Sequence, residues 1–427
     1  MVRRLSSPLL RNVFAVASGT ALAQVIVFAF SPLITRIYSP EVFGLQGVFM
    51  SLVSILSPVI SLRYPMAIVT AETEDEMLQL ARLSLIVTAV LSCALGLLLV
   101  AGGAPLAAVF GAEGLGLLIY LLPVATCFVA IQDVADYRAA RLGAFRLVGK
   151  VTAIVAFVTS LAKVLSGLAA PVAATLIVFN GLAPAFKAAL LQRGTKSLPV
   201  RVPRLGRAKM FTLLKKYRDF PIYRAPTDLL NAVSQALPVI LLAALFSPLV
   251  AGFFVLARSV TNLPMNVLGV AIGNVLYAKF ADMERSKQPL FPLVFKITVV
   301  LLCVPGTALA AAALFFPALF SFVFGEVWRA SGEYAMWMSL WLICMLVNIP
   351  TVRALPVIQR QGLHLVFNIV IFGAGGMSFL AGYMIEQTPL AAVIWFSIGT
   401  ASALVIQIIT YLVVILLHDQ IALGSKQ

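Results

Sequence analysis

The stretch "FGLQGVFMSLVSILSPVISLRYPMAIV", from Phe43 to Val69, decides the fold. It is apolar and longer than the roughly 20 residues that a helix needs to cross a bilayer. It nevertheless carries several serines and ends near Arg63. Residues three or four positions apart share one face of a helix, so these side chains form a polar stripe. Lipid penalises such a stripe, which must therefore face a neighbouring helix or a wet cavity. The stripe consists of Ser51, Ser54, Pro58 and Ser61.

Similar apolar runs recur along all 427 residues, of which 61% are hydrophobic and 11% are charged. Soluble domains contain about 25% charged residues, so the composition predicts a polytopic membrane protein built only from helices. We expect twelve transmembrane helices, arranged as two parallel six-helix halves around a central cavity. The expected spans are 12–35, 43–63, 81–101, 115–137, 147–169, 171–191, 227–246, 250–277, 293–318, 334–353, 363–385 and 391–417.

The distribution of positive charge predicts the orientation. Of the 31 lysines and arginines, 26 fall in the N-terminus and in alternate loops, whereas the opposite loops hold only Arg36 and Arg329. Cytoplasmic loops are the ones enriched in lysine and arginine, so both termini are predicted to be cytoplasmic. The most basic loop is "RGTKSLPVRVPRLGRAKMFTLLKKYRDFPIYR", residues 193–224. Either an anchor on anionic lipid or a dedicated partner site would explain its charge.

Three short motifs return in the same order and suggest an internal duplication. "YSPEVFG" (38–44) returns as "FSPLVAG" (246–252), "VFG" (109–111) returns at 323–325, and "RLG" (141–143) returns as "RQG" (360–362). Because each half holds an even number of spans, the two copies share one orientation. The predicted division is an N-terminal half at 1–191, a basic cytoplasmic linker at 192–226 and a C-terminal half at 227–427.

Polar residues within the spans are the candidate substrate site. The first span of each half carries amides, and the second span carries either the serine stripe or Arg258 with two asparagines. A cation at depth suits an anionic group, and amides and hydroxyls supply the donors and acceptors that a sugar needs. For the hydroxyls, helix–helix hydrogen bonding is the alternative. The predicted substrate-binding residues are Gln24, Ser54, Lys163, Asn231, Gln235, Arg258, Asn262 and Asn266.

Arg258 is the strongest single candidate in this set. It lies eight residues after Val250, about 12 Å along a helix, which is close to the depth of Gln235 in the preceding span. Asp228 lies much deeper, so we expect no acidic partner for Arg258 there. The five-donor guanidinium suits phosphate oxygens, whereas snorkelling to the outer headgroups is the competing interpretation.

Motifs for soluble-type catalysis are missing from the sequence. There is no Walker A loop, nucleophile elbow or dinucleotide-binding fingerprint, and no metal-ligand spacing around His364 and His418. The four cysteines fall inside predicted spans, where they suit packing. We therefore expect a transporter rather than an enzyme, with no cofactor and no metal.

Two stretches connect the chain to a known family. "TRIYSPEVFG" (35–44) and "SLRYPMAIVTAETEDE" (61–76) resemble the bacterial polysaccharide-biosynthesis flippases of the Wzx type, within the multidrug/oligosaccharidyl-lipid/polysaccharide exporter superfamily. Arg36, Pro40, Gly44 and Arg63 match positions typical of that family. The resemblance implies an inner-membrane protein that moves an undecaprenyl-diphosphate-linked oligosaccharide to the periplasmic leaflet. It also implies polymerase and chain-length proteins as partners.

Two other functions stay open at this point. A drug/cation antiporter normally needs a carboxylate deep in a span, whereas Asp133, Asp136 and Asp228 are expected near cytoplasmic helix ends. A membrane glycosyltransferase or polymerase would need catalytic acids or bases in large outer loops, and the outer loops here are short. The repeat-unit sugars, the pathway (O-antigen, capsule or exopolysaccharide), the coupling ion and the oligomeric state are left open by the sequence.

The predicted orientation can be tested by labelling. In a cysteine-free background, a cysteine placed at Lys196 or Arg207 should stay unlabelled when intact cells are treated with a membrane-impermeant thiol reagent, because the basic loop lies inside. A cysteine at Arg329, in a predicted outer loop, serves as the positive control. Strong labelling at Lys196 would invert the topology.

Overall fold

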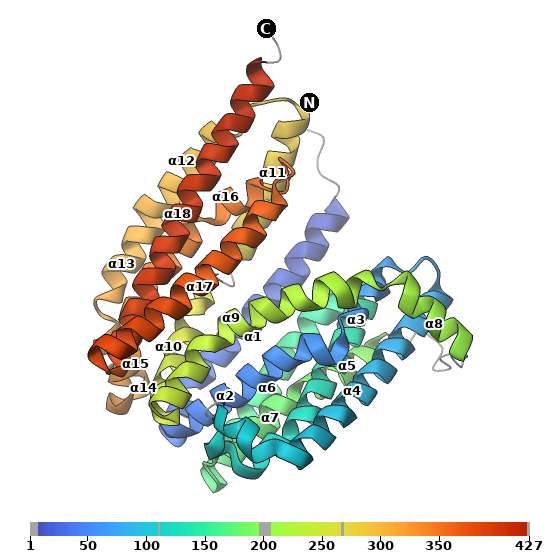
Figure 1. The fold of residues 1–427 in the computed structure, drawn as a ribbon, viewed down its shortest axis with the longest axis vertical. Coiled ribbons are helices and arrows are strands. Elements are labelled where there is room, and N and C mark those ends of the chain that lie inside the picture. The colour runs from blue at the N-terminus through green and yellow to red at the C-terminus, as the bar shows by residue number, and fades with distance from the viewer. Residues whose placement is uncertain (1–6, 110–111, 196–205, 266–268, 425–427) are drawn as a thin grey trace. The chain divides into compact units, whose positions relative to one another are not determined.

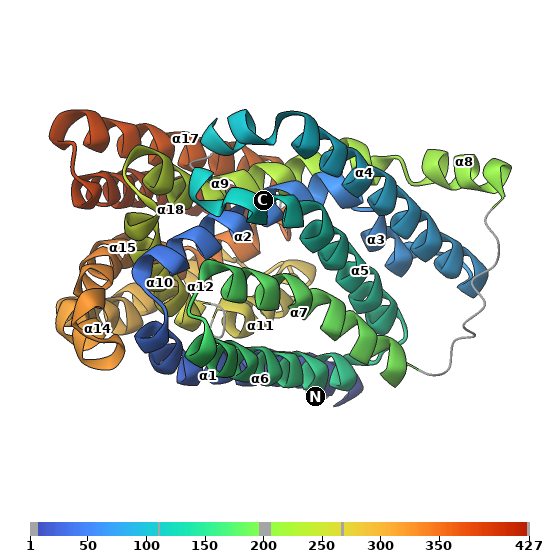
Figure 2. The same ribbon diagram turned by 90° about the horizontal axis from the view of Figure 1, so that it is seen from below.

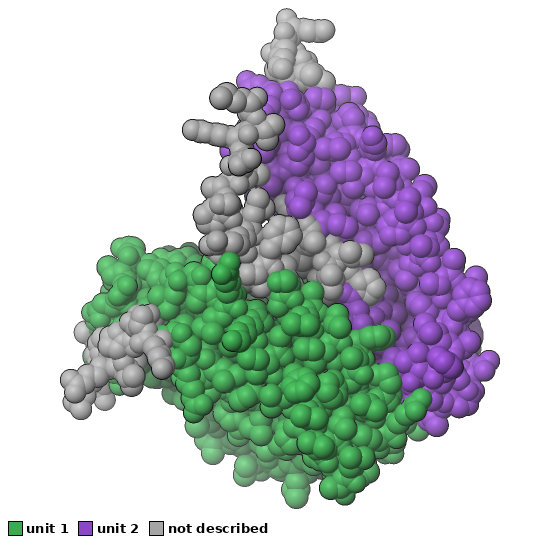
Figure 3. Space-filling view, turned by 180° about the vertical axis from the view of Figure 1, so that it is seen from behind, with its two compact units in different colours: residues 1–252 green, residues 253–427 purple. Residues whose placement is uncertain are grey.

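The computed structural model describes residues 7–109, 112–195, 206–265 and 269–424, and every regular element in these ranges is helical (Figure 1). Contacts divide the chain into two compact units, Met1–Gly252 and Phe253–Gln427, coloured separately in Figure 3. The first unit contains α9, which the repeat assigned to the second half, because α9 packs along α2.

The helices of the first unit follow the predicted spans closely. They are α1 (Ser7–Ile37), α2 (Pro40–Ser61), α3 (Tyr64–Ala67), α4 (Glu74–Val109), α5 (Leu122–Arg141), α6 (Phe145–Ala169), α7 (Ala173–Gly194), α8 (Arg207–Lys216) and α9 (Ala225–Leu245). Short 3₁₀ segments at Ile68–Thr70 and Glu113–Leu121 and a π-turn at Phe220–Arg224 connect them.

Helix α10 (Pro248–Pro264) begins at the boundary of the units, and the second unit continues with several short helices and two long ones, α17 and α18. They are α11 (Val270–Arg285), α12 (Phe291–Leu301), α13 (Thr307–Ala313), α14 (Phe316–Phe324), α15 (Arg329–Val347), α16 (Ile349–Ala354), α17 (Gln361–Glu386) and α18 (Pro389–Gly424). Between α12 and α13 the chain makes a π-turn at Leu302–Gly306, which includes Pro305. A proline has no N–H to donate to the helix ladder, which explains the break.

The prediction of an all-helical polytopic membrane protein is confirmed. Eleven helical segments among the described residues are long and apolar enough to span a bilayer, and Pro248–Leu263 is a shorter apolar helix. The expected span 250–277 covers this shorter helix and the first half of α11, and residues 266–268 between them lie outside the described residues.

The duplicated motif starts two helices with the same cap. The N–H of Val42 donates to the Ser39 hydroxyl at 3.4 Å, and the N–H of Val250 donates to the Ser247 hydroxyl at 3.4 Å. A proline follows each serine at the first helical position, where its missing N–H costs nothing. Both copies of the motif therefore cap the N-terminus of the helix that follows them.

The same motif also brings two glycines together inside the first unit. A Cβ added to Gly44 would lie 1.6 Å from the carbonyl oxygen of Pro248, and one added to Gly252 would lie 1.8 Å from that of Pro40. The contact is reciprocal, because each glycine meets the proline of the other copy. Such a pattern is expected when two copies face each other across a pseudo-two-fold axis. Only glycine permits this backbone approach.

Helix α8 folds the basic linker back onto the first unit. Leu213 and Tyr217 pack into a buried cluster with residues of α3 and α4. Lys216 forms ion pairs with Glu72 at 2.8 Å and Glu76 at 2.7 Å. The hydrogen bonds that the Lys216 ammonium donates to these carboxylates raise the pKa of Lys216 above its ordinary value. Residues 207–216, predicted as part of a linker, therefore form a helix, whereas 196–205 lie outside the described residues.

Helices α17 and α18 run side by side in the second unit (Figures 1 and 2), and α15 packs against α18. A buried polar chain joins α15, α17 and α18. Asn348 donates to Gln407 at 2.6 Å, Gln407 donates to the Tyr411 hydroxyl at 2.8 Å, and His364 lies 3.1 Å from that hydroxyl. Interhelical hydrogen bonds of this kind fix the packing of helices that have no hydrophobic driving force in lipid.

The glycine contact gives a stability prediction. Gly44→Ala and Gly252→Ala should each destabilise the protein by about 1–3 kcal/mol, because the new methyl group meets backbone atoms that cannot rotate away. Thermal unfolding in detergent should show a lower midpoint for both. Gly373→Ala is the control, since no atom lies within 4 Å of a Cβ added there. An unchanged midpoint for both contact variants would contradict the close approach.

Candidate functional site

The candidate site is built around the turn that ends α2. Leu62 and Arg63 both adopt left-handed backbone conformations, with φ of 44° and 54°. Two consecutive non-glycine residues in this region cost roughly 1–3 kcal/mol each, and such strain collects at functional sites. Ser61 stabilises the turn, since its hydroxyl donates to the Ser57 carbonyl at 2.9 Å and accepts from the Arg63 N–H at 3.3 Å. The turn directs the Arg63 side chain toward α5 and α9.

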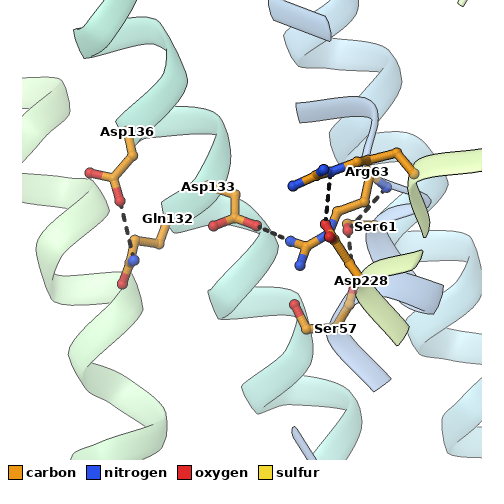
Figure 4. Close-up of polar contacts among 8 residues, drawn as sticks. Ser57, Ser61, Arg63, Gln132, Asp133, Asp136 and Asp228 are labelled. Atoms are coloured by element: carbon orange, nitrogen blue, oxygen red, sulfur yellow. Dashed lines mark hydrogen bonds and ion pairs between the residues drawn. The ribbon is translucent and has the colours of Figure 1, made fainter. Parts of the chain in front are cut away.

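Arg63 lies between two aspartates from different helices (Figure 4). Its Nη1 donates to Asp133 Oδ2 on α5 at 3.3 Å, and its Nε is 2.8 Å from Asp228 Oδ2 on α9. Arg224, one turn before Asp228, forms a second ion pair with that carboxylate at 3.3 Å. The Arg63 and Asp133 side chains are 21% exposed and that of Asp228 is 13% exposed, so the cluster is largely shielded. Its formal charges cancel, with two cations and two carboxylates.

A second ion pair lies beside the first one on α5. Lys187 of α7 donates to Asp136 Oδ2 at 2.9 Å, and Gln132 donates to the same oxygen at 3.2 Å. Asp133 and Asp136 stand three positions apart on α5, one facing Arg63 and the other facing Lys187. As the sequence predicted, these carboxylates lie toward helix ends, with Asp228 in the first turn of α9 and Asp133 and Asp136 in the second half of α5. All three aspartates lie inside candidate spans and each is ion-paired. Their pairing explains how the bilayer tolerates them.

A cavity of about 550 Å³ opens beside the Arg63 cluster. Its charged wall consists of Arg63, Asp133, Arg224 and Asp228, and Tyr137 adds a phenol. Its neutral polar wall carries the hydroxyls and amides of Ser54, Ser57, Asn231 and Gln235.

The serine stripe of α2 therefore has two roles. Of its serines, Ser54 lines the cavity, whereas Ser51 and Ser61 are buried against protein. Ser57, which is outside the stripe, is buried and also lines the cavity. Ser54 also donates to the Ser51 carbonyl at 2.8 Å, so its hydroxyl satisfies itself within the helix when the cavity holds no partner. Both explanations offered for the stripe, cavity and packing, apply to different serines.

Three of the predicted substrate-binding residues meet in this cavity: Ser54, Asn231 and Gln235. Gln24 is half-buried on α1 and does not line it. Lys163 lies on α6, where its ammonium donates to the Asn180 side chain at 2.6 Å. Arg258 and Asn262 are half-buried on the part of α10 that belongs to the second unit, and Asn266 lies outside the described residues.

The four positions typical of the family have different structural roles. Pro40 and Gly44 shape the start of α2, Arg36 is exposed at the end of α1, and Arg63 is the centre of the ion-pair cluster. The sequence analysis did not predict the partners of Arg63. A signal was present, because aspartates inside a span pair with cations, but nothing in the sequence chose among the basic residues.

Comparison with known proteins assigns the family. A family model described as "Polysaccharide biosynthesis protein" matches residues 33–333, well over half of the chain. The chain belongs to this family. The family resemblance seen in the two sequence motifs is thereby confirmed. No curated protein sequence matches the chain.

Solved structures show the same fold in transporters. A structure titled lipid II flippase MurJ, inward closed conformation, matches with a TM-score of 0.72 at 10% identity, covering 94% of this chain and 90% of that one. An inward-facing multidrug resistance MATE family transporter of the MOP superfamily matches with a TM-score of 0.63 at 13% identity, covering 98% and 97%. A Vibrio cholerae MATE transporter matches with a TM-score of 0.56 at 15% identity, covering 98% and 97%. At these identities the likeness concerns the fold alone.

The ion-pair cluster makes a prediction about coupling. Arg63→Gln leaves Asp133 without its cation and removes one of the two cations at Asp228, so it should lower the unfolding midpoint in detergent. Asp228→Asn should also lower it, because Arg63 and Arg224 lose their shared acceptor. The double variant Arg63→Gln/Asp228→Asn should lose less unfolding free energy than the two single variants lose together. The difference, which is the coupling energy of the pair, should be about 1–3 kcal/mol.

The control for this cycle is the exposed pair Arg285–Asp282, whose side chains are 77% and 55% exposed. An exposed pair contributes roughly 0–1 kcal/mol, so Arg285→Gln should leave the midpoint nearly unchanged. Strict additivity at Arg63 and Asp228 would show that their charges do not interact.

Proposed function

We propose that this chain is a flippase that carries an undecaprenyl-diphosphate-linked oligosaccharide from the cytoplasmic to the periplasmic leaflet. The observation that carries the proposal is the cavity beside Arg63, in which guanidinium groups adjoin a wall of hydroxyls and amides. A guanidinium fork suits phosphate oxygens, and the neutral wall suits sugar hydroxyls. Membership of the polysaccharide biosynthesis family and the MurJ-like fold support the same assignment.

Charge balance suggests how the substrate engages the site. In the structure, Arg63 is held by Asp133 and Asp228. A diphosphate brings about two negative charges and competes with these carboxylates for the same guanidinium. Neutralisation of an aspartate by a proton or a sodium ion would release Arg63 for the phosphate. The membrane potential, negative inside, would then favour outward movement by about 2.3 kcal/mol per charge per 100 mV.

Location and movement follow from the same proposal. The excess of lysine and arginine in alternate loops supports a bacterial inner-membrane protein with both termini in the cytoplasm. Rocking of the two halves would expose the substrate alternately to each leaflet. Arg258, Asn262, Asn266, Gln24 and Lys163 are proposed as further polar contacts, and polymerase and chain-length proteins as partners. The sugars and the pathway are not assigned.

A drug/cation antiporter is the second candidate, and one observation favours it. Asp133, Asp136 and Asp228 are carboxylates inside spans, the kind of group that such an exchanger uses to take up a proton and a cation. Their ion pairs with Arg63 and Lys187 weigh against it, because a carboxylate held by a cation is a poor receptor for another one.

Deletion and complementation test the proposal. A strain that lacks the chain should accumulate undecaprenyl-diphosphate-linked glycan on the cytoplasmic face, and the wild-type chain should restore periplasmic glycan. Arg63→Ala should reduce this restored glycan at least 10-fold at equal protein level, and Arg63→Lys should restore it only partly because the bidentate fork is lost. Arg285→Ala is the surface control. Normal glycan export in the deletion strain, together with new drug sensitivity, would replace the flippase by the antiporter.

A further inference from the structure

A second cavity, of about 480 Å³, lies between α1 and α6 in the first unit. The two helices run side by side (Figure 2), and their backbones touch at Gly19 and Gly149. A Cβ added to Gly19 would lie 2.3 Å from the Gly149 Cα. This contact fixes the spacing of the helices, so the cavity beside it has defined walls. The Arg63 cluster does not contribute to it.

The cavity is positive at one end and apolar at the other. Arg146 and Lys150 stand four positions apart on α6, so both cations lie on the face that meets α1. Lys150 begins the second turn of α6, while Ala153 and Ile154 line the cavity one turn further along. Leu22 of α1 faces them. Charge at the end of a span and apolar side chains above it match the layering of a headgroup and an acyl chain.

The two cations have no acidic neighbour in the described structure. Neither α1 nor α6 contains an aspartate or glutamate, and no carboxylate lies within ion-pair distance of Arg146 or Lys150 among the described residues. Arg138 and Arg141, close to them in sequence, are placed elsewhere, and Arg141 donates to the Val69 carbonyl at 3.0 Å. Both cations are thus available to form ion pairs with an anion from outside the protein.

We propose that this α1–α6 groove binds the headgroup of an anionic phospholipid. Its phosphate would be held by Arg146 and Lys150, and the start of an acyl chain would lie along Leu22 and Ile154. The volume leaves room for a phosphate and several water molecules, since one water occupies about 30 Å³ of liquid. The predicted orientation places this end of α6 at the cytoplasmic leaflet, whose anionic lipids attract basic residues. The bound lipid would fasten α1 to α6.

The test uses purified full-length protein in neutral detergent, titrated with phosphatidylglycerol or phosphatidylcholine while thermal unfolding is followed. Phosphatidylglycerol should raise the unfolding midpoint and phosphatidylcholine should not. Arg146→Gln/Lys150→Gln should weaken the apparent affinity for phosphatidylglycerol by about 30-fold, since each cation near a headgroup contributes roughly a factor of five. Arg146→Lys/Lys150→Arg should keep the response.

The matched control is Arg193→Gln/Lys215→Gln, which also removes two exposed cations but none that lines this cavity. It should respond to phosphatidylglycerol as the wild type does. If the Arg146→Gln/Lys150→Gln variant responds to phosphatidylglycerol as the wild type does, the proposed lipid site is wrong. The same conclusion follows if the control loses as much affinity as this variant. A response to undecaprenyl phosphate that needs these residues, without one to phosphatidylglycerol, would overturn the phospholipid assignment and make the groove an entry point for the carrier.

Discussion

The ion pairs of the Arg63 guanidinium with Asp133 and Asp228 hold together three parts of the first unit that are far apart in the sequence. Asp133 and Asp228 lie inside candidate spans, where a charge is tolerated only with a partner, so both require Arg63 within reach. The requirement connects α2, α5 and α9, and it explains why the chain accepts left-handed backbone at Leu62 and Arg63. The cost of the strained turn is offset by the ion pairs that the turn makes possible.

The same cluster explains the character of the cavity beside it. Because the cations and carboxylates cancel, the empty site carries no large net charge that the bilayer would penalise. Under the proposed function, an anionic ligand would bind by exchange, taking the place of a carboxylate on Arg63. The Ser54 hydroxyl, which lines the cavity, donates to the Ser51 carbonyl within α2.

The two copies of the recurring serine-proline motif, at 38–44 and 246–252, shape the backbone alike but precede different polar residues. Their capping motifs still act alike, with Ser39 and Ser247 starting α2 and α10 and Gly44 meeting the first turn of the other copy. Their polar residues differ, with serines and Arg63 on the second span of the first half and Arg258 with asparagines on that of the second. The caps and the glycine contact are thus alike in the two motif copies, whereas the polar residues that follow them differ.

The sequence by itself determined the helical membrane fold, the family and the residue types of the site. Apolar runs of about 20 residues have few structural options in a bilayer. The serine-proline pairs mark the residues at which α2 and α10 begin. Only the tertiary structure decided which charged and polar side chains pair with one another. Sequence spacing can place Ser54 on a face, but only the packing of α2 against α5 and α9 brings Arg63 to Asp133 and Asp228, which are 70 and 165 positions away. It also separated Lys163, which bonds to Asn180, from the cavity that it was expected to line. Ion pairs between distant helices depend on helix rotation and crossing, and neither is encoded in local periodicity.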